Sequence, residues 1–257
     1  MDAMPGTFEG VTLYKYRAYT AYALEMLINR ELYFAPPDQL NDPYDCRLNI
    51  RSSLTAAIAR AEQLQNKELH ERLQRLREID HVYEKMDRDL STLGVFSLSR
   101  TPTHILLWSH YAHNHIGFCA GFQFSEALTT HRGPHGIIGA TDVGYSTSNP
   151  FVEFFEEIAS SGNVPPWEEV WPTLLSVGMA VKADAWRYEE EVRILRSEPG
   201  TVPFSATELT EIVFGLNMPS PSRNTVRRVL SGADWAHVKF REIVRLDDFS
   251  FGVRDAT

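Results

Sequence analysis

The chain has 257 residues, of which 43% are hydrophobic and 23% are charged, and its formal net charge is −9. This composition is that of an ordinary globular protein and excludes a disordered, collagen-like or membrane-spanning chain. The negative charge disfavours a broad surface for nucleic acid. Cys46 and Cys119 are the two cysteines, too few for a disulfide framework, and they suit a reducing compartment. Because we find no signal peptide pattern and no apolar run of about 18 residues, we expect a cytoplasmic protein with no membrane partner.

The first elements are predicted from local patterns. Residues 11–17 read VTLYKYR, whose β-branched and aromatic residues predict a short strand. Thr20 is placed to cap a helix that runs through Arg30, and residues 32–35 predict a second strand. The prolines, asparagine and aspartate of residues 36–43 then predict a turn-rich loop.

Residues 53–93 contain neither glycine nor proline and are rich in Ala, Leu, Glu, Gln, Arg and Lys. Their apolar residues recur mostly three and four apart, which predicts a helical insertion with one buried stripe. A lid or a helix that binds a partner protein is the alternative interpretation.

The remaining elements alternate between strands and helices. Strands are predicted at 94–99, 117–124, 143–146, 189–195, 209–215 and 238–244, and helices at 102–112, 165–181 and 222–230. We find no internal repeat and no low-complexity linker. The economical prediction is one α+β domain over residues 1–257, with the helical insertion at 53–93 inside it.

The densest polar cluster reads WRYEEEVR and ends in the strand predicted at 189–195. Since side chains alternate faces along a strand, Glu189, Glu191 and Arg193 are expected on one face, opposite Val192. Paired carboxylates can hold a hydroxyl group or stabilise a cationic transition state. The alternative is a solvated edge strand that carries charges.

Two other strands carry polar groups on one face. Ser97 and Ser99 alternate with apolar residues in GVFSLS, and Lys15 and Arg17 alternate with tyrosines in LYKYR. Two hydroxyls can bind a ligand or a carboxylate, and a basic pair can bind phosphate. The alternative is an ordinary edge strand for the serines and a solvent-facing strand for the basic pair.

The order of these strands, with a basic residue first, hydroxyls next and Glu-x-Glu last, resembles the Arg–Ser–Glu class of ADP-ribosyltransferases. The chain also resembles a bacterial family known mainly as a domain of unknown function, through LYKYR, FAPPDQLNDPYD, FSLS with LLWSHYAHNHIGFCAGF, and KADAWRYEEEVRIL. The transferase resemblance implies a mixed sheet core arranged as a split β-sandwich. It also implies NAD as the substrate.

The transferase resemblance implies roles for individual residues. Cleavage of the nicotinamide–ribose bond builds positive charge on the ribose. Glu191 would bind the ribose hydroxyl and stabilise that cation, and Glu189 would orient the nucleophile. Ser97 would hold the glutamate or the nicotinamide ribose, with Ser99 nearby.

The basic role is open, because the chain has Lys15 and Arg17 where the class has one arginine, often followed by glycine. An aromatic residue such as Tyr16 or Tyr111 would stack on nicotinamide. The residues expected to bind NAD are Lys15, Arg17, Ser97, Ser99, Tyr16, Asn41, Asp42, His110, Tyr111 and Arg193.

The NDPYD segment has two interpretations. Asn41 and Asp42 precede a proline and are ordinary turn formers. In a pocket, Asp42 and Asp45 would instead bind substrate or a divalent metal. His110 and its neighbouring histidines fit no zinc spacing, so we expect no structural metal.

The leading prediction is an NAD-dependent ADP-ribosyltransferase, a toxin or defence effector that modifies an unknown protein or nucleic acid. The first alternative is a metal-dependent nuclease or phosphoesterase that uses Asp42, Asp45, Glu189 and Glu191. The second is a non-enzymatic binding module that recruits a partner through residues 53–93, because a fold does not guarantee activity.

Overall fold

The computed structural model describes residues 8, 10–46, 50–77, 88–128, 134–161, 173 and 176–256. The described residues fall into two compact units. The first unit takes its residues from Met1–Ala35, Gly94–Asp142 and Tyr188–Thr257, and the second from Pro36–Leu93 and Val143–Arg187. The second unit therefore extends beyond the insertion predicted at 53–93. That the chain is a single ADP-ribosyltransferase-like domain stays a prediction.

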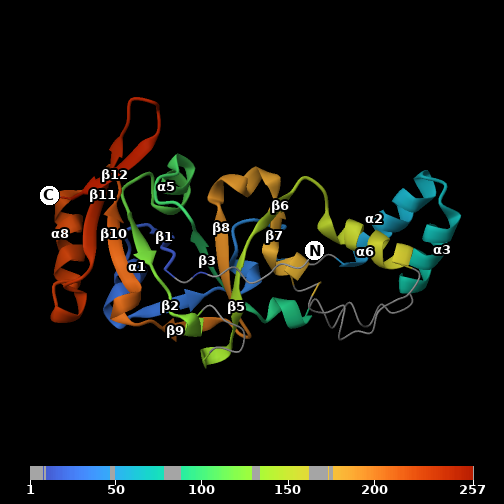
Figure 1. Ribbon diagram of the computed structural model, residues 1–257, viewed down its shortest axis with the longest axis horizontal. Coiled ribbons are helices and arrows are strands. Elements are labelled where there is room, and N and C mark those ends of the chain that lie inside the picture. The colour runs from blue at the N-terminus through green and yellow to red at the C-terminus, as the bar shows by residue number, and fades with distance from the viewer. Residues whose placement is uncertain are drawn as a thin grey trace. The chain divides into compact units, whose positions relative to one another are not determined.

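Eight strands of the described residues form the sheet of the first unit, in the order β12-β11-β10-β4-β1-β3-β8-β5 (Figure 1). Neighbours are antiparallel except β10 and β11, which are parallel, so the predicted α+β class with a mixed sheet is confirmed. The strands are β1 (Leu13–Arg17), β3 (Gly94–Ser99), β4 (Phe118–Phe122), β5 (Ile137–Asp142), β8 (Glu191–Arg196), β10 (Leu209–Phe214), β11 (Lys239–Arg245) and β12 (Phe251–Asp255).

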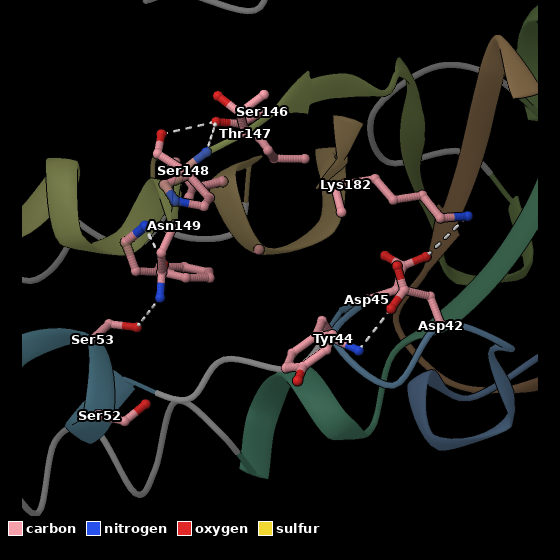
Figure 2. Close-up of a pocket in the computed structure, with 16 residues that line it drawn as sticks. Asp42, Tyr44, Asp45, Ser52, Ser53, Ser146, Thr147, Ser148, Asn149 and Lys182 are labelled. Carbon is pink, nitrogen blue, oxygen red and sulfur yellow. Dashed lines mark hydrogen bonds and ion pairs between the residues drawn. The ribbon is translucent and has the colours of Figure 1, made fainter. Parts of the chain in front are cut away.

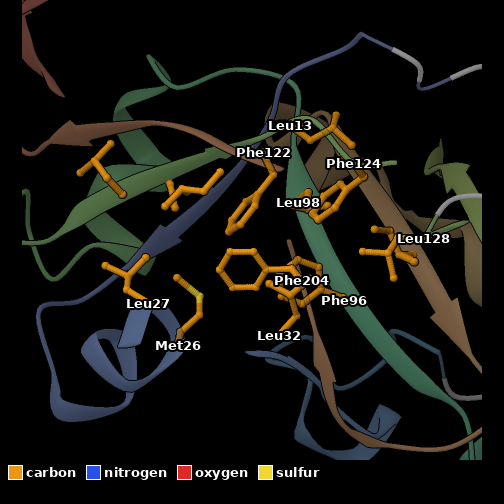
Figure 3. Packing of buried hydrophobic residues seen from close by; sticks show 14 of the residues in the cluster. Leu13, Met26, Leu27, Leu32, Phe96, Leu98, Phe122, Phe124, Leu128 and Phe204 are labelled. Carbon is orange, nitrogen blue, oxygen red and sulfur yellow. The ribbon is translucent and has the colours of Figure 1, made fainter. Parts of the chain in front are cut away.

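One face of this sheet carries the larger hydrophobic core, shown in Figure 3. Phenylalanines of β3 and β4 pack there against α1 (Ala21–Asn29), α8 (Ser220–Val229) and the pair formed by β2 (Glu31–Phe34) and β9 (Gly200–Pro203). The hydroxyl of Thr20 caps α1 by accepting from the backbone N–H of Ala23 at 3.3 Å, as predicted.

The opposite face is covered by α5 (Ile105–Tyr111). The fully buried Trp108 of this helix packs edge-on against Tyr16 of β1, with 5.1 Å between ring centroids. Cys119 of β4 and Val213 of β10 complete this smaller core. The candidate residues of β3 and β8 lie on this second face, as described below.

The second unit is mainly helical. Its helices α2 (Ile50–Gln63), α3 (Lys67–Leu76) and α6 (Pro150–Ser161) pack on one another, and β6 (Gly144–Ser146) pairs in parallel with β7 (Val181–Ala183) (Figure 1). Most of α2 and all of α3 lie within residues 53–93, where helical structure was predicted. In the described part of the chain, no helix has the length and apolar character needed to cross a membrane.

Several predicted elements differ from the structure. β3 and β8 each have a neighbour on both sides, so the alternative that they are edge strands is wrong. The helix predicted at 165–181 lies largely outside the described residues, and its last residue, Val181, begins β7. Within the described residues, β5, β7, β9, β12 and α6 were not predicted from the sequence.

Candidate functional site

Three strands that are far apart in the sequence are neighbours in the sheet, because β3 lies between β1 and β8. Ser99 is opposite Glu191, and Ser97 is opposite Arg193. Tyr14 of β1 is opposite Ser99. Residues directly opposite each other in a sheet point to the same face. The two serines, Glu191 and Arg193 therefore share the face that α5 covers.

Glu191 and Arg193 form a buried ion pair with two contacts. Arg193 Nε donates to Glu191 Oε1 at 2.7 Å, and Nη2 donates to Oε2 at 3.0 Å. The Glu191 side chain is 4% exposed and that of Arg193 is fully buried. Such a fork fixes the plane of the carboxylate and satisfies oxygens that burial removes from water.

The position of Glu189 differs from the prediction. It ends a 3-10 helix, Asp184–Glu189, and β8 begins only at Glu191. Between them, Glu190 has a left-handed backbone with φ of 44°. Glu189 and Glu191 were predicted to share one face because side chains alternate along a strand. The turn at Glu190 interrupts that alternation. Glu189 is nevertheless buried, and its Oε1 accepts from the hydroxyl of Tyr111 at 2.6 Å.

Lys15 and Arg17 alternate with Tyr14 and therefore point to the face opposite Glu191. The ammonium of Lys15 donates to the carbonyl oxygen of Ser97 at 2.6 Å and lies 4.7 Å from the centre of the Phe96 ring. Burial and, to a smaller extent, the charge of Arg17 together lower the pKa of Lys15 to about 7, against the opposing effect of the carboxylates of Glu191 and Glu189.

Arg17 has a different environment. Burial lowers the pKa of its guanidinium, and within the described residues its Nε is buried without a hydrogen-bond partner. Of the two candidates for the basic role, Lys15 is therefore the one whose hydrogen bond to β3 is observed, at the carbonyl oxygen of Ser97.

The aromatic candidates occupy distinct positions. Tyr16 donates its hydroxyl to the carbonyl oxygen of Thr101 at 2.8 Å, so it belongs to the packing under α5. Tyr111 contacts Glu189 directly. His110 is exposed and lies beside Tyr188, with 6.4 Å between ring centroids.

Asn41, Asp42 and Asp45 belong to the second unit. Asp42 Oδ1 accepts from the backbone N–H of Tyr44 at 2.9 Å, which is the turn geometry predicted for this segment. Asp45 forms an ion pair with the buried Lys182 at 3.5 Å. Within the described ranges, no group of three or more His, Cys, Asp or Glu residues is arranged to hold a metal ion. The described residues therefore provide no set of metal ligands to support the alternative of a metal-dependent nuclease or phosphoesterase.

The sequence analysis missed three residues near the candidate groups. The ring of His104 stacks on the ring of Tyr188, the residue before Glu189, with 5.3 Å between ring centroids. Lys182 is 5% exposed. Tyr188 lies inside the polar cluster WRYEEEVR, and this position was the signal that could have identified it. Lys182 is a single charged residue between apolar residues in a short strand, and that isolated charge was its signal.

Comparison with known proteins gives one family. A family model described as a protein of unknown function, DUF2971, matches residues 107–194, which is less than half of the chain. The matched segment includes Tyr111, Glu189, Glu191 and Arg193. The predicted resemblance to a domain of unknown function is confirmed for this segment. No curated protein and no solved structure gives a significant match, and the resemblance to ADP-ribosyltransferases stays a prediction.

Proposed function

We propose that this protein is an ADP-ribosyltransferase that cleaves NAD at the nicotinamide–ribose bond and transfers ADP-ribose to an acceptor. The observation that carries the proposal is the adjacency of β1, β3 and β8, which places Ser99 opposite Glu191 on one face of the sheet. From the opposite face, the ammonium of Lys15 donates to the backbone carbonyl oxygen of Ser97. A basic residue, hydroxyls and a carboxylate on three neighbouring strands are the groups that the Arg–Ser–Glu resemblance requires. The finer fold assignment, a split β-sandwich of the transferase type, belongs to the same proposal.

The proposed chemistry needs a carboxylate beside a developing cation. As the C–N bond breaks, nicotinamide leaves with the bonding electrons and the ribose acquires oxocarbenium character. The acceptor atom then bonds to the ribose carbon and loses its proton. Glu191 binds the ribose hydroxyl and stabilises this charge, while Arg193 holds the carboxylate in a fixed plane.

The neighbouring groups take supporting roles in this proposal. Glu189, held by Tyr111, orients the acceptor, and the half-buried Ser97 binds the nicotinamide ribose. Lys15 takes the basic role in preference to Arg17 as a positioning residue, because from the sheet face opposite Glu191 its ammonium holds β3 through the carbonyl oxygen of Ser97.

The test measures nicotinamide release from NAD, and transfer of adenine-labelled ADP-ribose to proteins and nucleic acids of a bacterial lysate. Glu191→Gln should lower nicotinamide release by about 100-fold or more, because an aligned charge contributes at least as much as one oxyanion-hole donor. Glu190→Gln is the matched control, since Glu190 is the exposed neighbour in the same motif. It should leave the rate within about twofold, as a surface change does.

Loss of the charge of Glu191 also removes its ion pair with the buried Arg193, so circular dichroism must show that the variant is folded. Ser97→Ala provides a second variant that keeps the ion pair intact, and it should lower the rate as well. If the wild-type protein neither binds NAD nor releases nicotinamide, or if Glu191→Gln is folded and fully active, the proposal is wrong.

A further inference from the structure

A cavity of about 400 Å³ lies within the second unit (Figure 2). Its walls are the turn after Asn41, the first turn of α2, the segment that connects β6 to α6, and the residues from 177 through β7. This volume is within the usual range for small-molecule sites, about 300–1,000 Å³. The residues that line it come from four separate segments, so the fold of the whole unit shapes it.

The charged groups of the cavity are buried and close together. The ammonium of Lys182 lies 3.5 Å from Asp45 Oδ2, and these side chains are 3% and 2% exposed. Asp42 is also 3% exposed and presents a second carboxylate to the cavity, with Oδ1 held by the backbone N–H of Tyr44 (Figure 2). Burial of three charged groups is costly unless each has polar partners.

The opposite wall consists of neutral polar groups. The hydroxyls of Ser146 and Ser148 are 3.1 Å apart, and Asn149 donates from Nδ2 to the hydroxyl of Ser53 at 3.0 Å (Figure 2). Hydroxyl groups both donate and accept hydrogen bonds. At the rim, the ring of Tyr44 is 85% exposed and offers a flat apolar surface.

These groups favour one class of ligand. A divalent cation would meet the ammonium of Lys182 and only two carboxylates. A phosphate would meet two carboxylates and a cation that is already paired with Asp45. A neutral polyol is repelled neither by the ammonium nor by the carboxylates. Its hydroxyls donate to carboxylates and exchange hydrogen bonds with serines, and its C–H face packs on an aromatic ring.

We propose that this cavity binds a neutral, hydroxyl-rich small molecule, either a free sugar or the ribose of a nucleoside. Asp42 accepts hydrogen bonds from the ligand hydroxyls, the Lys182–Asp45 pair orients them, and Tyr44 covers the open side. This site is independent of the proposed transferase, because none of its residues belongs to β1, β3 or β8.

The test uses saturation-transfer NMR and calorimetry with D-ribose, D-glucose and adenosine, at concentrations up to about 10 mM so that millimolar affinities are detected. Ser52→Phe places a ring in the cavity from an exposed position of α2, so it should remove binding without unfolding the protein. Asp42→Asn keeps the acceptor for the N–H of Tyr44 but removes the charge, and should weaken binding by about tenfold.

Asp38→Asn is the matched control: it makes the same chemical change at an exposed position four residues away, outside the cavity, and should leave affinity unchanged. Binding of the sugars identifies a free sugar as the ligand, and binding of adenosine alone identifies a nucleoside. The proposal is overturned if none of the three probes binds, or if Ser52→Phe and Asp42→Asn do not alter their binding. It is also overturned if inorganic phosphate or Mg²⁺ binds instead and Ser52→Phe abolishes that binding.

Discussion

The side chain of Lys15 is half-buried, and its ammonium donates to the carbonyl oxygen of Ser97. Burial and the charge of Arg17 disfavour protonation, so its pKa falls from 10.5 to about 7. In the unfolded chain this lysine stays protonated until pH values near 10.4. Between these two values the unfolded state binds more protons than the native state, so the stability of the protein should rise with pH.

The measurement is the free energy of unfolding by urea between about pH 7 and 8.5. The contribution of Lys15 should reach about 1.4 kcal/mol per pH unit, and Lys15→Met should remove it. Above this range the slope should flatten, because burial raises the pKa of the Cys119 thiol, which then retains a proton that the unfolded thiol loses and so contributes with the opposite sign. Lys239→Met, at an exposed lysine of β11, is the control. An equal slope in wild type and Lys15→Met would refute the argument.

At the scale of elements, the start of β4 depends on a close approach of two chain segments. A Cβ atom on Gly117 would lie 2.0 Å from the carbonyl oxygen of Arg17 and 3.0 Å from Cα of Ala18. Backbone atoms cannot move aside as a flexible side chain can. Gly117→Ala should therefore destabilise the protein by about 2–3 kcal/mol, in the range of overpacked cores.

Thermal unfolding followed by circular dichroism tests this prediction. Gly144→Ala is the control, because the nearest atom to its added methyl group would be the carbonyl oxygen of Ala180 at 3.6 Å. Its effect should stay within about 0.5 kcal/mol. Equal melting temperatures for the two variants would show that Gly117 is not sterically required.

The elements that the sequence predicted well are those with strong local signals. β3 was predicted with its correct bounds, because GVFSLS alternates cleanly and follows glycine-free helical sequence. α6 was missed because it begins at Pro150, which indicates a break, and because its phenylalanines have strand preference. β9 was missed because GTVP is short and contains glycine and proline.

The candidate site could be predicted only in part. Local alternation gave the shared face of Ser97 and Ser99 and that of Glu191 and Arg193. The left-handed conformation of Glu190 could not be foreseen, because a glutamate seldom adopts it. The adjacency of β1, β3 and β8 depends on contacts across the whole sequence, and a family resemblance, not periodicity, suggested it.

At the scale of the whole molecule, we expect the two units to differ in the free energy needed to open them. β1, β3, β4 and β8 are paired on both sides in the large sheet. α2 and α3 are short helices with many exposed residues, and their packing partner is α6 of the same unit. Local opening of such helices costs less free energy than separation of interior strands.

Hydrogen exchange measured by mass spectrometry tests this difference. Amides of β4 should exchange only through global unfolding, with a free energy equal to that from urea titration. Amides of α2 and α3 should exchange faster, through opening of their own unit. Equal protection of α3 and β4 would mean that the two units unfold as one cooperative body.

Because of the turn at Glu190, Glu189 and Glu191 form hydrogen bonds with different elements of the fold. Glu191 is tied to Arg193 on its own strand, whereas Glu189 is tied through Tyr111 to α5. A displacement of α5, for instance when a ligand enters beside it, would pull on Glu189 and leave Glu191 in place. Glu191 would thus keep its position while Glu189 moves with α5. Substitutions in α5 could therefore change what Glu189 contacts without disturbing Glu191.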